Sequence, residues 1–313
     1  MRKPKNPDSL IQSWISQLDR RKTLFPELFA SAEQALRLVD DKENTGYACD
    51  KLGDRLWFYR FRESEMDAEE QQAIKLFTEA TRLTKSVIRQ MTNRGEAPAI
   101  SSDEEVVWTA CEGAAKFQLA QGRGWSPGLF LDQRGNRQWV RENATGKKLL
   151  NLFCYTGGFS INAALGGATE VVSVDTSKQT LQWCKENFRL NDLQIADYEF
   201  WPADARAFLQ ACKRKQRKFD LIICDPPSFA RNKHQVFKID KDGAELVISC
   251  LDCLDHHGKL LFSCNYEKWS RQDLLEQATA WASTYHPASV QLLPRSLDYA
   301  ETAPMKSVLI SLD

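Results

Sequence analysis

The sequence predicts an α/β protein, in which a smaller N-terminal α/β domain precedes a Rossmann-like parallel sheet covered by helices. Two observations carry this prediction. In the second half of the chain, apolar runs of strand length alternate strictly with amphipathic runs of helical length. The strand runs are almost unbroken in apolar residues, which is typical of parallel strands buried on both faces. A stretch rich in Gly and Pro, residues 121–130, precedes them and indicates a linker.

Composition bounds the class of protein. Hydrophobic residues make up 42% and charged residues 27% of the 313, as in ordinary globular proteins. Lys plus Arg and Asp plus Glu number 42 each, so nucleic-acid binding would need a local patch rather than net charge. The nine cysteines follow no framework spacing, which suits reduced thiols and a cytoplasmic location. No membrane-spanning run and no apolar signal core is present, so neither membrane insertion nor secretion is expected.

The first third of the chain predicts helices and short strands. Residues 8–40 have a helical pattern, and residues 35–61 contain strand-like runs around polar turns. Residues 67–91 repeat apolar side chains at helical spacing, which predicts one helix. Short strands are predicted at 104–113 and 115–120. The predicted domains are a helical extension at 1–35, a small α/β domain with linker at 36–124, and the sheet domain at 125–313.

The second half of the chain predicts the sheet domain in order. Strands are predicted at 147–154, 170–175, 198–204, 219–225 and 258–265, with closing runs at 288–294 and 305–312. Helices are predicted between them at 157–165, 177–191, 205–215, 243–257 and 271–283. Sheets of this kind bind ligands beyond the carboxyl ends of their strands, so the candidate site is expected there.

Polar and glycine residues follow the predicted strands. A Gly-Gly pair that starts at Gly157 opens the first helix of this domain, where glycine would let the backbone approach a ligand. A tight turn without a ligand is the alternative. Asp175 ends the second strand, 18 residues after Gly157, where a carboxylate can accept hydrogen bonds from ribose hydroxyls of an adenosine cofactor. Asp175 and Asp204 could instead cap the helices that follow them.

The end of the fourth strand narrows the class of cofactor. The G-x-G-x-x-G spacing of dinucleotide sites is absent after the first strand. The fourth strand ends in Asp225, Pro226, Pro227, Ser228 and Phe229, where two prolines stiffen the loop. Such a loop exposes backbone carbonyls and an aromatic face, which suits a flat base held beside a methyl donor. The alternative is a stiff turn that packs the aromatic ring into the core.

Four motifs carry a resemblance to a known family. They are GLFLDQR at 128–134, NLFCYTG at 151–157, VDTS at 174–177 and DPPSF at 225–229. With them the chain resembles the class I S-adenosylmethionine-dependent methyltransferases, and more narrowly a bacterial family with cytosine-C5 and guanine-N7 members that methylates 23S ribosomal RNA. The resemblance covers residues 36–313 and is strongest after 120.

The resemblance implies a fold, a cofactor and a partner. The fold would be a seven-stranded sheet whose last two strands form an antiparallel pair, the cofactor S-adenosyl-L-methionine, and the partner 23S ribosomal RNA. The residues that would line the cofactor pocket are Asp132, Arg134, Phe153, Tyr155, Thr156, Gly157, Asp175, Thr176, Ser177, Asp204, Ala205 and Asp225.

The base to be methylated decides the chemistry that the site needs. Carbon C5 of cytosine is a poor nucleophile, so a thiolate must first add to C6. Cys264 lies at the carboxyl end of the fifth strand, and Ser263-Cys264 matches the Ser-Cys of the cytosine members; Asp225 would then hydrogen-bond the base. Guanine N7 already carries a lone pair and needs only positioning. Asn265 resembles the guanine members, which have Ser-Asn-Asn here. The thiol favours cytosine, and guanine stays open.

Basic residues near the site are candidates for binding RNA phosphates. Arg134, Arg137 and Arg141 would share one face of a helix near the pocket, and Arg231 and Lys233 lie beside the Asp-Pro-Pro loop. Ordinary surface charge is the alternative. The residues predicted to bind the substrate are Pro226, Pro227, Phe229, Arg137, Arg231 and Lys233.

Functions from other classes are alternatives to this prediction. No metal site is expected, because the C-x-x-C at Cys250 and Cys253 has no second pair and suits a buried core. A dinucleotide-dependent oxidoreductase and a non-catalytic RNA-binding module are the alternatives from other classes. The sequence leaves the oligomeric state open.

Overall fold

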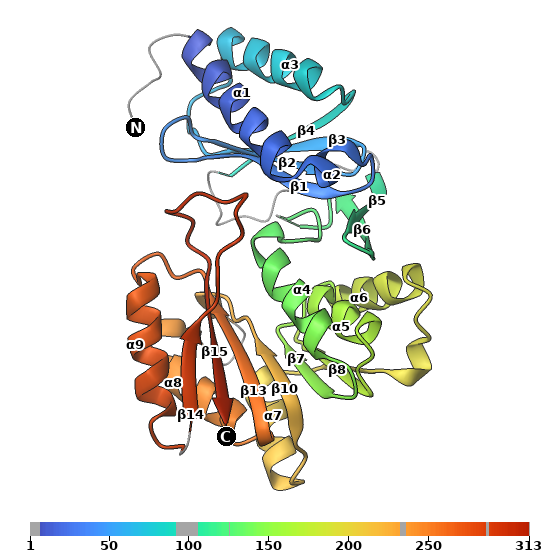
Figure 1. Cartoon of the computed structure of the whole chain (residues 1–313), viewed down its shortest axis with the longest axis vertical. Coiled ribbons are helices and arrows are strands. Elements are labelled where there is room, and N and C mark those ends of the chain that lie inside the picture. Colours follow the sequence, from blue (N-terminus) through green and yellow to red (C-terminus); the bar gives the residue numbers. More distant parts are fainter. Residues whose placement is uncertain (1–6, 92–105, 125, 232–235, 286–287, 313) are drawn as a thin grey trace. The chain divides into compact units, whose positions relative to one another are not determined.

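The structure, a computed structural model, describes residues 7–91, 106–124, 126–231, 236–285 and 288–312. Its backbone divides into two compact units (Figure 1). Unit 1 comprises Met1–Leu131 and Leu297–Glu301, and unit 2 comprises Asp132–Ser296 and Thr302–Asp313. The three-part domain division expected from the sequence stays a prediction about which parts fold independently.

Unit 1 is a small sheet with helices on one face. The sheet order is β1-β2-β3-β4, with antiparallel pairing up to β3 and parallel pairing of β3 with β4. A separate antiparallel ladder joins β5 and β6. The strands are β1 (Ala35–Asp41), β2 (Tyr47–Leu52), β3 (Arg55–Arg60), β4 (Lys85–Gln90), β5 (Val106–Glu112) and β6 (Ala115–Gln121). The helices are α1 (Pro7–Leu24), α2 (Pro26–Ala30) and α3 (Ala68–Thr81).

An aromatic cluster forms the core of unit 1. The indole of Trp14, on α1, lies 5.0 Å from the ring of Tyr47, 5.8 Å from that of Phe58 and 5.6 Å from that of Phe77. All four side chains are fully buried. Because Tyr47 and Phe58 come from the sheet and Phe77 from α3, α1 packs against both in this core.

The single helix predicted at 67–91 is wrong in its second half. Asp67 and Glu70 form a capping box that starts α3, and Arg82 ends the helix with a left-handed backbone, at φ 60°. Residues 85–90 form β4 instead. The β-branched Val87 and Ile88 suit a strand as well as a helix, and parallel pairing with β3 decides between them. Residues 35–40 likewise belong to β1, not to a helix.

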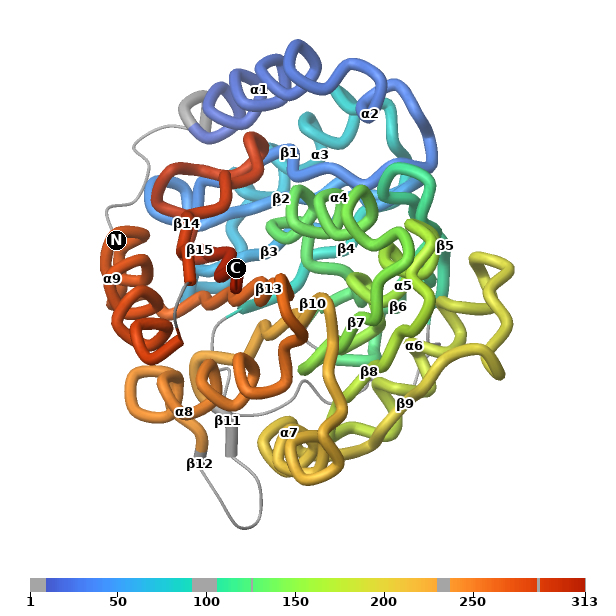
Figure 2. Tube along the Cα trace, turned by 60° about the horizontal axis from the view of Figure 1, so that its bottom comes forward, coloured from blue at the N-terminus to red at the C-terminus, as the bar shows by residue number. Residues whose placement is uncertain are grey.

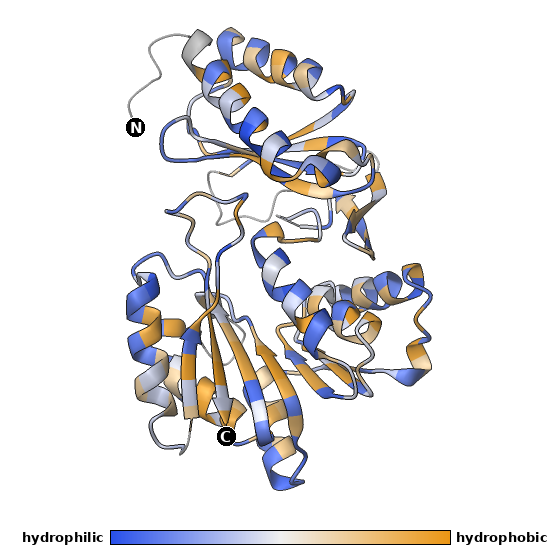
Figure 3. Ribbon diagram, in the orientation of Figure 1, coloured by the Kyte–Doolittle hydropathy of each residue, from blue (hydrophilic) through white to orange (hydrophobic). Residues whose placement is uncertain are grey.

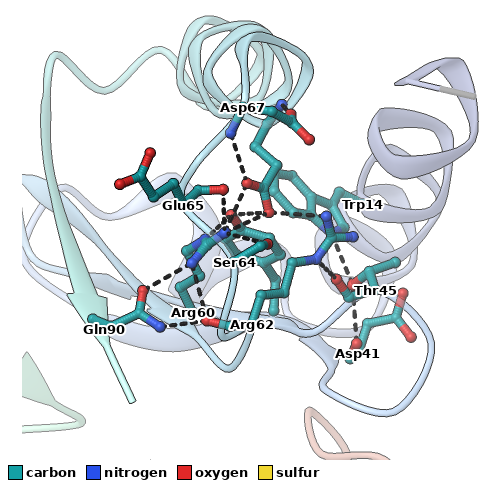
Figure 4. A network of polar contacts seen from close by, with 11 residues as sticks. Trp14, Asp41, Thr45, Arg60, Arg62, Ser64, Glu65, Asp67 and Gln90 are labelled. Atoms are coloured by element: carbon teal, nitrogen blue, oxygen red, sulfur yellow. Dashed lines mark hydrogen bonds and ion pairs between the residues drawn. The ribbon is translucent and has the colours of Figure 1, made fainter. Parts of the chain in front are cut away.

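A buried ion pair ties α3 to the sheet. The guanidinium of Arg60 donates to the Glu70 carboxylate at 2.9 Å, and both side chains are almost fully buried. Arg62 and the Tyr47 hydroxyl each donate to the same carboxylate at 2.9 Å, and the backbone N–H of Asp67 does so at 3.1 Å. Figure 4 shows the surrounding polar contacts. The hydrogen bonds of this cluster offset the free-energy cost of burying the charges of Arg60 and Glu70.

A segment from the C-terminal part of the chain completes unit 1. It lies in the connection between β14 and β15. The Arg37 backbone N–H donates to the Asp298 carboxylate at 3.1 Å, and the Arg21 guanidinium donates to the Asp298 carbonyl at 2.8 Å. The Ala300 backbone N–H donates to Asp40 at 2.8 Å. Asp298 is fully buried by these contacts.

Unit 2 confirms the predicted seven-stranded α/β fold. The sheet order is β14-β15-β13-β10-β7-β8-β9, parallel from β13 through β9 and antiparallel at β15 and β14. The strands are β7 (Lys148–Leu152), β8 (Glu170–Asp175), β9 (Glu199–Pro202), β10 (Phe219–Cys224), β13 (Leu254–Cys264), β14 (Ala288–Leu292) and β15 (Lys306–Leu312). A short hairpin pairs β11 (Phe229–Arg231) with β12 (Val236–Lys238).

Helices cover both faces of the large sheet (Figure 2). One face carries α4 (Arg134–Asn143), α5 (Gly158–Leu165) and α6 (Lys178–Leu190), with the short helix η1 (Leu131–Gln133) leading into α4. The other carries α7 (Ala205–Arg214), α8 (Ile239–Leu251) and α9 (Arg271–Ala282). Figure 3 shows how apolar the central strands are, as burial on both faces requires.

Helix α8 ends earlier than predicted. The apolar pattern at 243–257 suggested one helix, but α8 ends at Leu251 and β13 begins at Leu254. Residues 254–257 therefore belong to the strand.

None of the helices within the described ranges combines the length and the apolar character that a membrane crossing requires.

Candidate cofactor and substrate site

Three parallel strands of unit 2 end side by side. Strands β8, β7 and β10 are neighbours, so Asp175, Phe153 and Asp225 all lie at one edge of the sheet. The alternation of strands and helices predicts this convergence, because the carboxyl ends of parallel strands meet at the same edge. Residues of three of the four sequence motifs are thereby brought together.

The loop after β7 has an unusual backbone. Phe153, Tyr155 and Gly157 all have positive φ, at 57°, 49° and 87°. For two aromatic residues this conformation is unfavourable and needs surrounding contacts to hold it. Part of that support comes from Asp175, whose carboxylate accepts a hydrogen bond from the Tyr155 backbone N–H at 3.1 Å. Another part comes from Asn187, whose side chain donates to the Thr156 carbonyl at 3.0 Å.

Local packing explains the glycine at 157 without a ligand. Its φ of 87° is one that side chains rarely adopt, and a Cβ added there would collide with the Cys184 sulfur on α6. The tight-turn alternative is therefore sufficient to explain this glycine, and the close approach of a ligand stays a prediction. A bound molecule would meet the backbone N–H groups at the start of α5, which begins with no side-chain cap.

We expect Gly157→Ala to destabilise the protein by about 2–4 kcal/mol, because the left-handed backbone costs about 1–2 kcal/mol and the collision with Cys184 adds to it. Urea denaturation would measure this loss. In a Cys184→Ala background the loss should shrink toward the backbone cost alone. The matched control is Gly135→Ala in α4, where an added Cβ meets open space and helix propensity predicts a gain of about 0.5–1 kcal/mol.

Asp175 is held in place by backbone groups. Its two carboxylate oxygens accept hydrogen bonds from the N–H groups of Tyr155, at 3.1 Å, and Ser177, at 2.9 Å. Burial raises the pKa of this carboxyl group, and the backbone donors oppose that rise. The carboxylate is thus fixed between the loops after β7 and β8. The predicted role in binding ribose hydroxyls is compatible with this placement and stays a prediction.

The residues after β8 and β9 cap helices. Ser177 accepts a hydrogen bond from the Thr180 backbone N–H at 3.1 Å and begins α6. Asp204 accepts from the N–H groups of Arg206 and Ala207 at 3.0 and 3.2 Å and begins α7. The capping alternative is therefore sufficient for Asp204, and its place at the adenine edge stays a prediction. Thr176 is exposed, and Ala205 is buried at the first position of α7.

The Asp-Pro-Pro loop presents its aromatic ring outward. Pro226 is buried, Pro227 is exposed, and the side chain of Phe229 is 57% exposed, which excludes the alternative that this ring packs into the core. The Ser228 hydroxyl donates to the Asn265 side-chain oxygen at 2.6 Å. This bond ties the loop after β10 to the segment after β13.

Asp225 carries the most perturbed carboxyl group of the site. Burial, and then the charge of Asp132, raise its pKa to about 7, while a hydrogen bond from Gln133 and the charge of Arg137 oppose the rise. The Gln133 side-chain N–H donates to Asp225 Oδ2 at 3.0 Å. Perturbed carboxyl groups of this kind cluster at functional sites. Asp132 itself is half-buried in η1.

Cys264 lies in the apolar core at the end of β13. Its side chain is fully buried and belongs to the hydrophobic cluster that also contains Phe262 and Cys224. Burial raises the pKa of its thiol, which the Tyr266 backbone and Lys306 partly offset and Asp225 reinforces. A nucleophilic cysteine needs a lowered pKa and access to its substrate. The placement of Cys264 therefore weighs against the predicted nucleophile and favours a packed thiol.

The basic residues predicted to contact RNA phosphates differ in their burial and position. Arg137 is almost fully buried in α4, with its guanidinium 6.0 Å from the Phe159 ring and its side chain against Gly158. Arg134 and Arg141 are half-buried on the same helix. Arg231 lies in β11, and Lys233 lies outside the described residues. The predicted RNA contacts of these residues stay predictions.

The sequence prediction missed two residues of the site, Gln133 and Asn136. Gln133 lies inside the GLFLDQR motif, between Asp132 and Arg134, whose charges make them the more obvious candidates. Asn136 Nδ2 donates to Gln133 Oε1 at 2.5 Å and to the Ser307 hydroxyl at 2.8 Å. A polar residue at a buried helix position was the available signal, since such side chains need hydrogen-bond partners.

A family model and several known proteins match this chain. Residues 65–310 match the family model described as S-adenosylmethionine-dependent methyltransferase. The chain is 34% identical over 263 residues to ribosomal RNA large subunit methyltransferase K of Neisseria meningitidis, covering 79% of this chain and 73% of the relative. It is 44% identical over 160 residues to methyltransferase K/L of Saccharophagus degradans. That match covers 50% of this chain but only 21% of the relative.

A solved structure agrees with this match. The crystal structure of SMU.776, described as a methyltransferase and complexed with S-adenosylhomocysteine (SAH), superposes with a TM-score of 0.84 at 25% identity. The superposition covers 100% of this chain and 83% of that chain. The comparisons favour a methyltransferase over the dinucleotide-dependent oxidoreductase and the non-catalytic module.

The residues of the site fit S-adenosylmethionine. The cofactor carries ribose hydroxyls, from which a carboxylate such as that of Asp175 can accept hydrogen bonds. It also carries a sulfonium cation, which the neighbouring carboxyl groups of Asp132 and Asp225 suit by their charge. The first turn of α5 offers backbone N–H groups suited to an anionic group. Donors and acceptors of the right charge therefore surround the strand ends.

Proposed function

The chain belongs to the S-adenosylmethionine-dependent methyltransferases, and from this premise we propose that it methylates a base of large-subunit ribosomal RNA, at N7 of guanine. The names of the relatives support the RNA substrate. The observation that carries the choice of base is the burial of Cys264. Guanine N7 needs positioning and not a thiolate, so a packed thiol is compatible with it. A ribosomal substrate would put the activity in the cytoplasm.

The residues of the site have distinct parts in this proposal. Bound S-adenosylmethionine would supply an electrophilic methyl group. The Asp175 carboxylate would hold the cofactor at the end of β8, and Phe229 would stack on the acceptor base from its exposed position. Asp225 would contact the base directly. Pro226 and Pro227 would keep that loop rigid, so the base is held without further ordering cost.

Cytosine C5 is the second candidate. The observation that favours it is the position of Cys264 at the end of β13, where its thiol interacts electrostatically with both Asp225 and Lys306. For this chemistry the thiol would have to move out of the core and ionise, against the rise of its pKa. The guanine proposal requires no such movement.

We expect Cys264→Ala to retain methyl transfer to ribosomal RNA within a few fold of the unchanged protein, because the thiol is packed rather than exposed. Transfer would be measured with labelled S-adenosylmethionine, and mass spectrometry of nucleosides would identify the modified base. Cys224→Ala, at another fully buried thiol of the same core, is the matched control for packing loss.

Two results would overturn the guanine proposal. One is loss of all transfer in Cys264→Ala while Cys224→Ala stays active. The other is a denaturation-resistant complex between the protein and RNA that contains 5-fluorocytosine, which traps a thiolate adduct because fluorine replaces the C5 proton that a base would otherwise remove to release the thiolate. Either result would restore cytosine C5.

A further inference from the structure

A buried chain of hydrogen bonds runs behind Asp225. Gln133 Nε2 donates to Asp225 Oδ2 at 3.0 Å, and Gln133 Oε1 accepts from Asn136 Nδ2 at 2.5 Å. Asn136 Nδ2 also donates to Ser307 Oγ at 2.8 Å, and Ser307 lies 2.8 Å from Ser263 Oγ. The four side chains behind Asp225 are at most 7% exposed. We call Gln133, Asn136, Ser307 and Ser263 the amide relay.

The amide relay sets which end of the Gln133 amide meets Asp225. Because Gln133 Oε1 is occupied by Asn136, its Nε2 is the group that faces the carboxyl group. An N–H donor stabilises the charged form of a carboxyl group, whereas a carbonyl oxygen in the same place would require the protonated form. The orientation of the Gln133 amide in the amide relay therefore favours the carboxylate form of Asp225, which accepts hydrogen bonds.

We propose that Gln133, oriented by Asn136, is a positioning residue that keeps Asp225 as a hydrogen-bond acceptor, so that the site reads the donor edge of guanine. Guanine presents N1–H and N2–H donors on its Watson–Crick edge, which a carboxylate accepts, whereas cytosine N3 would need a donor. The specificity part of this inference rests on the proposed function. The orientation of Asp225 does not.

Several charged groups act on Asp225 from the elements around it. Asp132 of η1 favours the protonated form, and Arg137 of α4 favours the carboxylate. The thiols of Cys264 on β13 and Cys224 on β10 interact with it as well, and Lys306 of β15 acts on Cys264. With the pKa raised to about 7, the loss of one donor changes the charge of Asp225 at neutral pH.

The test compares the pKa of Asp225 in four proteins. Carbon-13 NMR of aspartate-labelled protein would follow the carboxyl resonance, assigned with Asp225→Asn. Gln133→Met keeps the length of the side chain but removes the N–H donor to Asp225. Asn136→Asp places a carboxylate acceptor beside Gln133, which should turn the Gln133 amide so that its Oε1 faces Asp225. Gln138→Met, at an exposed glutamine of the same helix, is the matched control.

The expected result is a rise in the pKa of Asp225 by about one to two units in Gln133→Met and Asn136→Asp, the size expected for one hydrogen bond to a charged group. Their methyl transfer at pH 7 should fall about fivefold to fiftyfold, in step with the ionised fraction of Asp225, and recover toward pH 9, because the carboxylate returns. Gln138→Met should change neither. Two variants guard against one that fails to fold.

Different outcomes separate this inference from the proposed function. An unchanged pKa of Asp225, with transfer reduced by the same factor at every pH, would show a merely structural relay and overturn the inference. Modified cytosine among the nucleosides, with the pKa shift present, would overturn the guanine assignment and its reading by the relay. The orientation of Asp225 by Gln133 would survive that result.

Discussion

Asp225→Asn is expected to lower methyl transfer by roughly two orders of magnitude or more while making the folded protein more stable above pH 7. The loss follows from removing the carboxylate proposed to meet the base. The gain follows from removing a carboxyl group whose pKa is raised to about 7, mainly by burial and by the charge of Asp132. The asparagine fits the site, since its oxygen can accept from Gln133 and its N–H can face Asp132.

The pH dependence has a definite sign. Between the ordinary pKa of an aspartate and pH 7, the folded protein holds a proton that the unfolded chain has released, so stability falls as pH rises. Above pH 7 the whole penalty is present, at most about 4 kcal/mol for a rise of about three units. Asparagine does not titrate, so the advantage of the variant should grow over this window.

Urea denaturation of both proteins at pH 5 and pH 8.5 measures this effect. Asp204→Asn is the matched control, because asparagine caps a helix as well as aspartate does and should leave α7 unaffected. An equal stability difference between Asp225→Asn and the unchanged protein at both pH values would contradict the assignment of the raised pKa.

The fold of unit 2 could be predicted because its signals are local. Each strand and helix shows its own apolar period, and strict alternation leaves few arrangements other than a parallel sheet. Once the sheet is assumed, Asp175 and Asp225 must lie at one edge, since both end neighbouring strands. The motif residues are therefore brought together by topology alone.

The contacts behind the site could not be predicted in this way. Asn136, on α4, and Ser307, on β15, are 171 positions apart in the sequence and meet only in the folded protein. Likewise, a cysteine at the end of a strand can point toward the substrate or into the core. The alternation of side chains along the strand does not decide between these two directions for the last residue. The burial of Cys264 needed the structure.

Chain patterns also failed where two secondary structures compete. Val87 and Ile88 continue the helical spacing of α3, yet they lie in β4 because Arg82 ends the helix and an open edge of β3 is available for pairing. Tertiary pairing overrides local spacing at such positions. Asp298 is a further case, because nothing in its sequence neighbourhood indicates that its carboxylate accepts a hydrogen bond from the backbone of Arg37 in β1.

Glu70→Ala is expected to destabilise unit 1 by about 3–5 kcal/mol, because it leaves the buried guanidinium of Arg60 without its counter-charge. Three further hydrogen bonds, from Tyr47, Arg62 and the Asp67 backbone, would be lost with the carboxylate. Although burial opposes ionisation, the hydrogen bonds from Arg60, Tyr47 and the Asp67 backbone, together with the charge of Arg60, hold the pKa of Glu70 below its ordinary value. Its contribution is therefore present above that ordinary value and is lost as the pH falls through the folded pKa.

Thermal unfolding at pH 7 measures the loss, and Glu69→Ala on the same helical turn is the matched control. Glu69 is exposed, so its replacement should change stability by no more than about 0.5 kcal/mol. The residues predicted to bind the cofactor, from Asp132 to Asp225, all belong to unit 2, whereas Glu70 belongs to unit 1. Glu70→Ala should therefore leave the affinity for S-adenosylhomocysteine unchanged at temperatures where the protein is folded. Equal unfolding temperatures of the two variants would contradict the role of the buried pair, since only one of them removes a buried charge.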